Sequence, residues 1–198
     1  MLEPVRQYAH EKLEEGGAAG EARRRHAAFF LRLAERAYPE LRGPRQVEWL
    51  ERLERENGNL RAAMGWALSE HEAEIAGRMV WALWLFWLLR AHYDEGRRWV
   101  ETLLERDLPP DLRPKVLHVA AATAYTQGDY EACDRYSAEA LELARREDDA
   151  LAEAYARCEL GLVAMHRGNL ETAESRFEEA LTLVHRSGDE GLSSLVRA

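Results

Sequence analysis

The sequence is poor in the residues that interrupt helices and in those that form cross-links. Of its 198 residues, 13 are glycine, six are proline and two are cysteine. So few glycines and prolines favour a helical chain over a loop-rich one. Cys133 and Cys158 are too few for a disulfide framework, and the N-terminus does not resemble a secretory signal. We therefore expect two buried, reduced thiols in a cytoplasmic protein.

The chain also lacks an apolar run long enough to cross a membrane. Its longest run, Met79–Leu89, lies between Arg78 and Arg90, whereas a spanning helix needs about 20 residues. Because this run is apolar on every side, it predicts a central helix that other helices cover. We expect no membrane association.

A surplus of positive charge is missing as well. The net charge is −9, with 36 acidic and 27 basic side chains. Binding a phosphate backbone needs a positive surface, so we expect no direct contact of this segment with nucleic acid. The one basic cluster, Arg23–Arg25, is either a solvated helix face or a site for phosphate or an acidic partner.

Apolar residues recur with helical spacing along the first half of the chain. They predict helices over about 2–13, 21–37, 47–55, 60–68 and 79–89. The glycine-rich stretch 16–20 and Pro39 are expected to end the first two. Asn57-Gly58-Asn59 predicts a break or kink, with Asn59 as the cap of the following helix.

The second half is repetitive. Its spacing predicts helices over about 94–106, 112–127, 130–146, 150–167 and 170–185, and a truncated helix from 188. Asp111 can cap the second of these. Turns at Ala91, Gly128 and Gly168 lie 37 and 40 residues apart, and Gly96 would let its helix approach a partner closely. We therefore predict an all-α fold of antiparallel helical hairpins stacked as a solenoid.

The last full hairpin resembles the tetratricopeptide repeat (TPR). The residues that carry this resemblance are Leu160-Gly161, Gly168-Asn169-Leu170, Ala173, Phe177 and Ala180-Leu181. The hairpin at Gly128 is a weaker match, and Arg157 stands where the repeat commonly has an aromatic residue or leucine. The resemblance implies a right-handed, TPR-like solenoid.

Other segments resemble bacterial signal-transducing ATPases of the STAND class. They are Met1–Leu13, Arg24–Leu31, Asn59–Ala63 with Trp66-Ala67-Leu68, and Gly96–Trp99. In that family these elements lead from the nucleotide-binding core into a TPR-like C-terminal sensor, often in LuxR-type transcriptional regulators. The resemblance implies that the chain is a C-terminal fragment.

Pattern and resemblance together divide the chain into three parts. Residues 1–18 would be the tail of a winged-helix-like segment, and residues 19–71 would be linker and capping helices. Residues 72–198 would be TPR-like repeats, with units at about 72–108, 112–147 and 150–187 followed by the truncated helix.

Motifs for catalysis or cofactor binding are missing. A phosphate-binding loop needs lysine followed by serine or threonine, but Leu13 follows Lys12 and Val116 follows Lys115. His71-Glu72 begins like a zinc-protease motif, yet Ile75 replaces the second histidine. We therefore expect a chain that is not an enzyme and binds no cofactor or metal.

Binding in a groove is the remaining possibility. In a TPR stack the first helix of each hairpin lines the concave surface. In this register the candidate groove residues are Trp81, Leu85, Leu88, His118, Ala122, Tyr125, Tyr155, Cys158, Leu162, Met165 and His166. For Trp81, Leu85 and Leu88 the alternative is a structural role under the N-terminal helices. Tyr125, Tyr155 and His166 have a structural role as their alternative too, and His118 could be an ordinary residue of the groove wall.

Two functions fit these features. The chain would be a non-catalytic sensor and scaffold of a STAND-class transcriptional regulator, with a protein, a peptide or a small-molecule inducer as ligand. Alternatively, it would be a stand-alone TPR adaptor that binds a peptide or protein. The winged-helix-like start favours the first.

Overall fold

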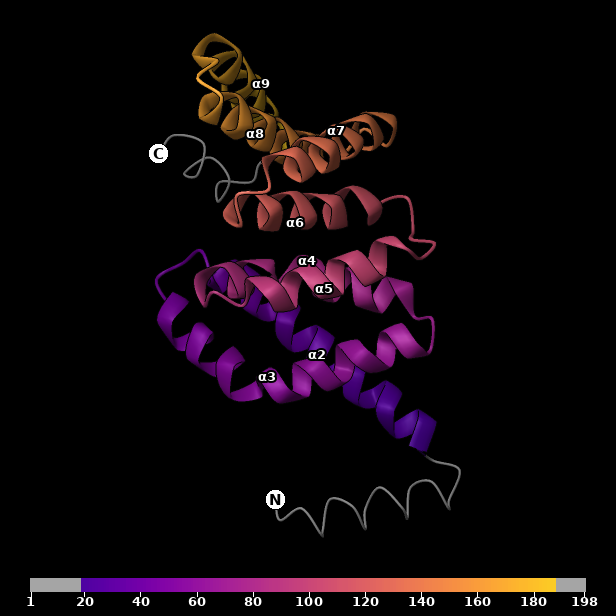
Figure 1. Cartoon of the computed structure of the whole chain (residues 1–198). Coiled ribbons are helices and arrows are strands. Elements are labelled where there is room, and N and C mark those ends of the chain that lie inside the picture. Colours follow the sequence, from indigo (N-terminus) through magenta and orange to yellow (C-terminus); the bar gives the residue numbers. More distant parts are fainter. Residues whose placement is uncertain (1–18, 188–198) are drawn as a thin grey trace.

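Figure 1 shows the computed structural model of the chain, in which residues 19–187 are described. All regular elements in that range are helices, which confirms the predicted all-α class for it. They are α2 (Ala19–Glu40), α3 (Gln46–Ser69), α4 (Ala73–Leu89), α5 (Tyr93–Leu104), α6 (Arg113–Thr126), α7 (Tyr130–Arg146), α8 (Ala150–His166) and α9 (Leu170–Ser187). The predicted helices at 2–13 and from 188 lie outside the described residues.

The helices stack in chain order. Each helix packs against the next one, and α2, α4, α6 and α8 also contact one another in succession. In Figure 1 the chain passes from α2 and α3 at one end to α8 and α9 at the other. The even-numbered helices therefore form a continuous row, with the odd-numbered helices packed beside it.

Helix α4 is the centre of the core. It contacts α2, α3, α5 and α6, and its Met79, Val80 and Phe86 are fully buried. Burying each such side chain stabilises the fold by about 1.5–3 kcal/mol. The predicted central, covered helix is confirmed, although it begins at Ala73. No helix in the described part of the chain is both long and apolar enough to cross a membrane.

Five of the connections share one geometry. The residues with left-handed backbone are His71, Ala91, Gly128, Asp148 and Gly168. After Gly128, for example, the backbone N–H of Asp129 donates to Ala124 O at 2.9 Å, as in a Schellman motif. The Asp129 carboxylate then accepts the backbone N–H of Ala132 at 3.1 Å. At this joint a short turn thus ends one helix and caps the next, which produces a tight antiparallel hairpin.

The predicted break at Asn57-Gly58-Asn59 is wrong. Helix α3 passes through it without interruption. Asn57 is buried between Leu53 and Leu60, so the core-facing stripe continues across it. A glycine inside a helix costs only about 1 kcal/mol, less than the burial of these leucines gains. The Asn59 side chain donates to Glu56 at 2.7 Å and caps nothing.

The predicted cap at Asp111 is also wrong. Helix α6 begins at Arg113, after Leu112. The backbone N–H groups of both residues donate to Pro109 O, at 2.9 and 3.1 Å. A separate turn at 109–112 therefore positions the start of α6, and the Asp111 side chain is exposed.

Two glycines allow close helix contacts. A Cβ on Gly96 would lie 3.0 Å from the Trp87 ring, and one on Gly161 would lie 2.8 Å from the Phe177 ring. Gly96 thus has the packing role that the sequence predicts. In both hairpins an aromatic ring occupies the space that a larger residue would need.

Candidate functional site

The predicted groove residues all come from α4, α6 and α8, but they differ in exposure. Tyr155, His118 and Cys158 are only 1%, 3% and 6% exposed. Met165 and His166 are exposed. The half-buried members are Trp81, Leu85, Leu88, Ala122, Tyr125 and Leu162. A partner that docks on this face without moving the helices can touch only the exposed and half-buried residues.

Two of the buried members, His118 and Tyr155, belong to an aromatic cluster where α4, α6 and α8 meet. The His118 and Tyr155 ring centroids are 4.2 Å apart, and Trp84 packs edge-on against His118 at 4.9 Å. Arg42, from the α2–α3 connection, donates a hydrogen bond to the Tyr155 hydroxyl. The cluster therefore joins the α2–α3 connection to α4, α6 and α8. Sequence reasoning missed Trp84 and Arg42, because nothing local indicates that they meet α8.

A series of buried polar side chains lies beside this cluster. His118 Nδ1 is 2.6 Å from Glu159 Oε1, although their approach is not aligned as a hydrogen bond. Ser137 Oγ donates to Glu159 Oε2 at 3.0 Å. Burial raises the pKa of the Glu159 carboxyl, and the contacts with His118 and Ser137 oppose that rise. These three polar side chains connect α6, α7 and α8 inside the protein, where no ligand can reach them directly.

The two cysteines are buried thiols whose ionisation is suppressed. Both are free and buried, as the sequence predicts. Burial raises the pKa of each thiol to about 12. The thiolate, which is the nucleophile, is therefore almost absent at neutral pH. Within residues 19–187, no group of three or more histidine, cysteine, aspartate or glutamate side chains is placed to hold a metal ion.

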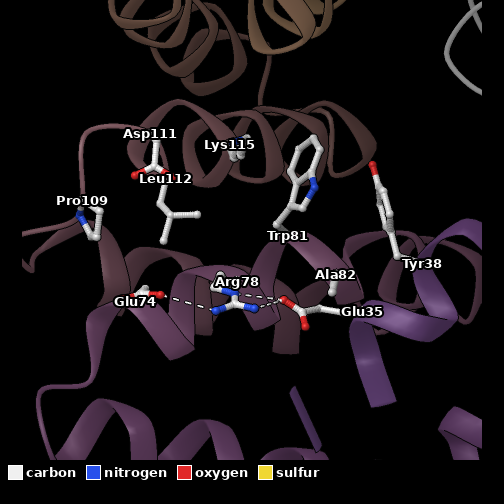
Figure 2. Close-up of a pocket in the computed structure, with 10 residues that line it drawn as sticks. All are labelled: Glu35, Tyr38, Glu74, Arg78, Trp81, Ala82, Pro109, Asp111, Leu112 and Lys115. Atoms are coloured by element: carbon white, nitrogen blue, oxygen red, sulfur yellow. Dashed lines mark hydrogen bonds and ion pairs between the residues drawn. The ribbon is translucent and has the colours of Figure 1, made fainter. Parts of the chain in front are cut away.

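A pocket opens between α2, α4, α6 and the α5–α6 connection (Figure 2). Its volume is about 730 Å³, within the range of small-molecule sites. The residues that line it are Glu35, Tyr38, Glu74, Arg78, Trp81, Ala82, Pro109, Asp111, Leu112 and Lys115. We call it the α2–α4–α6 pocket. Sequence reasoning proposed only Trp81 among these residues, because the lining comes from four separate segments.

Ion pairs organise one wall of this pocket. Arg78 donates from Nε and Nη2 to Glu35 Oε1, at 2.9 and 2.6 Å. Its Nη1 lies 3.4 Å from Glu74 Oε1, so the guanidinium sits between two carboxylates (Figure 2). The hydrogen bonds to Glu35 raise the pKa of Arg78 above its ordinary value. This pairing fastens α2 to α4 at the pocket.

The departure from the TPR pattern at Arg157 has a structural explanation. This side chain is 8% exposed. It donates to Glu153 Oε1 at 3.0 and 2.6 Å, and from Nη1 to Glu179 on α9. A charged clamp thus occupies the position where an apolar contact between helices is usual, and it joins α8 to α9.

Part of the chain is similar to known proteins. No family model matches the chain. Proteins of Mycobacterium bovis and of two strains of Mycobacterium tuberculosis, each named "Putative HTH-type transcriptional regulator", are 34% identical to it over 105 residues. That stretch is 53% of this chain and 12% of each relative, so the chain spans only a small part of their length. Over about half of its residues, the chain is weakly homologous to these named regulators.

Proposed function

We propose that the chain is a regulatory segment of a longer transcriptional regulator and serves there as a non-catalytic scaffold for a protein or peptide. The observation that carries the proposal is that α4, α6 and α8 lie next to one another in the row of even-numbered helices. Each of these helices has a predicted groove residue that a partner can reach, namely Leu85, Tyr125 and Met165. Three successive hairpins can therefore contribute to one docking surface.

The repeated joints support a TPR-like solenoid as the form of this scaffold. Left-handed residues end α4, α6 and α8, and a new helix starts directly afterwards. The homology to named transcriptional regulators supports the regulatory role, and the segments that resemble the STAND class suggest a sensor region of such an ATPase. In such a protein the ligand acts by binding one state of the regulator more tightly than the other.

A substitution in the native gene tests this role. Met165 is 45% exposed within the proposed surface, whereas Val47 is 66% exposed on α3, outside it. Met165→Glu should reproduce at least part of the transcript changes caused by deleting the gene. The control Val47→Glu, which introduces the same charge, should leave the transcript profile as in the wild type.

Two results would contradict the proposal. If deletion changes no transcripts, the regulatory role fails. If both glutamate variants change the same transcripts to the same extent, the docking surface is not the one formed by α4, α6 and α8. Circular dichroism of the purified variants checks that both remain folded.

A further inference from the structure

The α2–α4–α6 pocket has more acidic than basic groups available to a ligand. Its lining contains three carboxylates, Glu35, Glu74 and Asp111, and two cations, Arg78 and Lys115. Arg78 is already paired with the two glutamates. The Lys115 ammonium lies 3.5 Å from Asp149, a carboxylate outside the lining. Both cations are therefore neutralised, and a ligand would experience a negative surplus.

Asp111 supplies the carboxylate with free hydrogen-bonding capacity. Its side chain is exposed and belongs to the lining of the pocket, and within residues 19–187 it forms no hydrogen bond or ion pair. The backbone turn at 109–112 holds it there, since Pro109 O accepts from both Leu112 and Arg113. A charge held in place by its backbone loses less entropy when it pairs with a ligand.

Aromatic and apolar surface adjoins these carboxylates. Trp81 and Tyr38 pack with ring centroids 5.6 Å apart, and Leu112 and Ala82 complete the apolar part of the lining. Aromatic faces attract cations, tryptophan most strongly. The nearby cation Arg42 lies 4.5 Å from the centroid of the Tyr38 ring and donates a hydrogen bond to the Tyr155 hydroxyl. Its guanidinium is therefore already engaged by aromatic side chains of the protein.

We propose that the α2–α4–α6 pocket binds an organic ammonium ion. The charged nitrogen pairs with Asp111, the two glutamates of the Arg78 wall add negative charge to the same pocket, and the apolar part of the ligand packs against Trp81 and Leu112. The ammonium belongs either to a free amine or to a lysine side chain of a partner protein. This inference does not depend on the proposed regulatory function, and it concerns a different opening from the surface around Met165.

Binding of matched probes to the full chain tests the proposal. 2-Phenylethylamine and 3-phenylpropionate have similar apolar parts and opposite charges. Calorimetric titration should show saturable binding of the amine and roughly tenfold weaker binding of the acid, since a charge-assisted contact contributes on this scale. Nα-acetyl-lysine amide is the third probe. Whichever amine binds more tightly identifies the source of the ammonium.

Two variants locate the binding. Asp111→Asn should weaken amine binding about fivefold, an effect on the scale of one charge-assisted contact. Asp107→Asn removes the same charge from the same connection at an exposed residue outside the lining, and should leave binding unchanged. No saturable binding of either amine, equal binding of the amine and the acid, or equal effects of the two variants would overturn the proposal. None of these results bears on the transcript experiment.

Discussion

At the scale of single residues, backbone conformation decides where the helices turn. His71, Ala91 and Asp148 have left-handed backbone with φ of 61°, 57° and 53°. An L-residue in this region is strained by about 1–2 kcal/mol, and glycine is not. The strain is tolerated because the turn reverses the chain, so that the next helix can pack against the one before it. The pattern of turns at Ala91, Gly128 and Gly168 is visible in the sequence, although only two of the three are glycines.

Ala91→Gly should therefore stabilise the protein. Relief of the left-handed strain outweighs the free-energy cost of the extra entropy that glycine adds to the unfolded chain. We therefore expect the free energy of unfolding to rise by about 0.5–1 kcal/mol. Urea unfolding followed by circular dichroism measures it. Ala62→Gly, at an exposed position inside α3, is the control and should lose about 0.5–1 kcal/mol. A loss in both variants would contradict the role of the turn.

At the scale of the helices, packing decides which glycines are needed. Gly161 lies against the Phe177 ring, so the α8–α9 contact depends on a missing side chain. Gly58, in the middle of α3, has no atom within 4 Å of an added Cβ. Both lie inside helices, where local preference would favour alanine equally. Only the neighbouring helix distinguishes the two positions.

Substitutions at these two glycines should have opposite effects. Gly161→Ala should destabilise the protein by about 1–2 kcal/mol, because overpacking against Phe177 outweighs the better helix propensity. Gly58→Ala should stabilise it by up to about 1 kcal/mol. Chemical unfolding of both variants tests this pair. Stabilisation by Gly161→Ala would show that the two helices can separate slightly without cost.

At the scale of the whole molecule, the aromatic cluster joins distant parts of the chain. Tyr155 on α8 contacts the Trp81 ring of α4 at 5.5 Å and the His118 ring of α6 at 4.2 Å. Arg42 adds the α2–α3 connection through its hydrogen bond to Tyr155. The larger contacts between helices otherwise join a helix to the next one or to the next but one along the chain. This cluster is therefore where the first helices and the later hairpins depend on one another.

Tyr155→Ala should destabilise the whole protein by about 3–5 kcal/mol, as expected for loss of a fully buried aromatic side chain. Tyr125 is only half-buried, so the matched variant Tyr125→Ala should cost less than half as much. Guanidinium unfolding monitored by tryptophan fluorescence and by circular dichroism compares them. Equal losses of stability in the two variants would show that the aromatic cluster stabilises the protein no more than the contacts of a half-buried tyrosine do.

Much of the architecture could be predicted because helices obey local rules. Apolar spacing predicts the helices, and a run that is apolar on every side, Met79–Leu89, predicts a covered centre. Local rules failed at Asn57-Gly58-Asn59, where burial of the neighbouring leucines outweighs weak breaking signals. They also failed at Asp111, where a turn of the preceding backbone positions the helix instead.

The candidate sites could be predicted less well. The register identifies which helices contribute groove residues, yet it cannot show that Arg42 and Trp84 cover the inner side of α6 and α8. His118 and Tyr155 are therefore buried, whereas Tyr125 and Met165 can reach a partner. The α2–α4–α6 pocket was not visible at all, since its residues are up to 80 positions apart.

The sequence by itself determined most of the helices, the hairpin spacing and the central position of α4, because these follow from spacing along the chain and from apolar content. Only the tertiary structure decided which face of each helix is covered and which residues meet around a cavity. Burial depends on side chains contributed by other helices, and no local pattern contains their positions. The pairing of Arg78 with Glu35, and the free carboxylate of Asp111 across the same pocket, exist only once α2, α4 and α6 pack together.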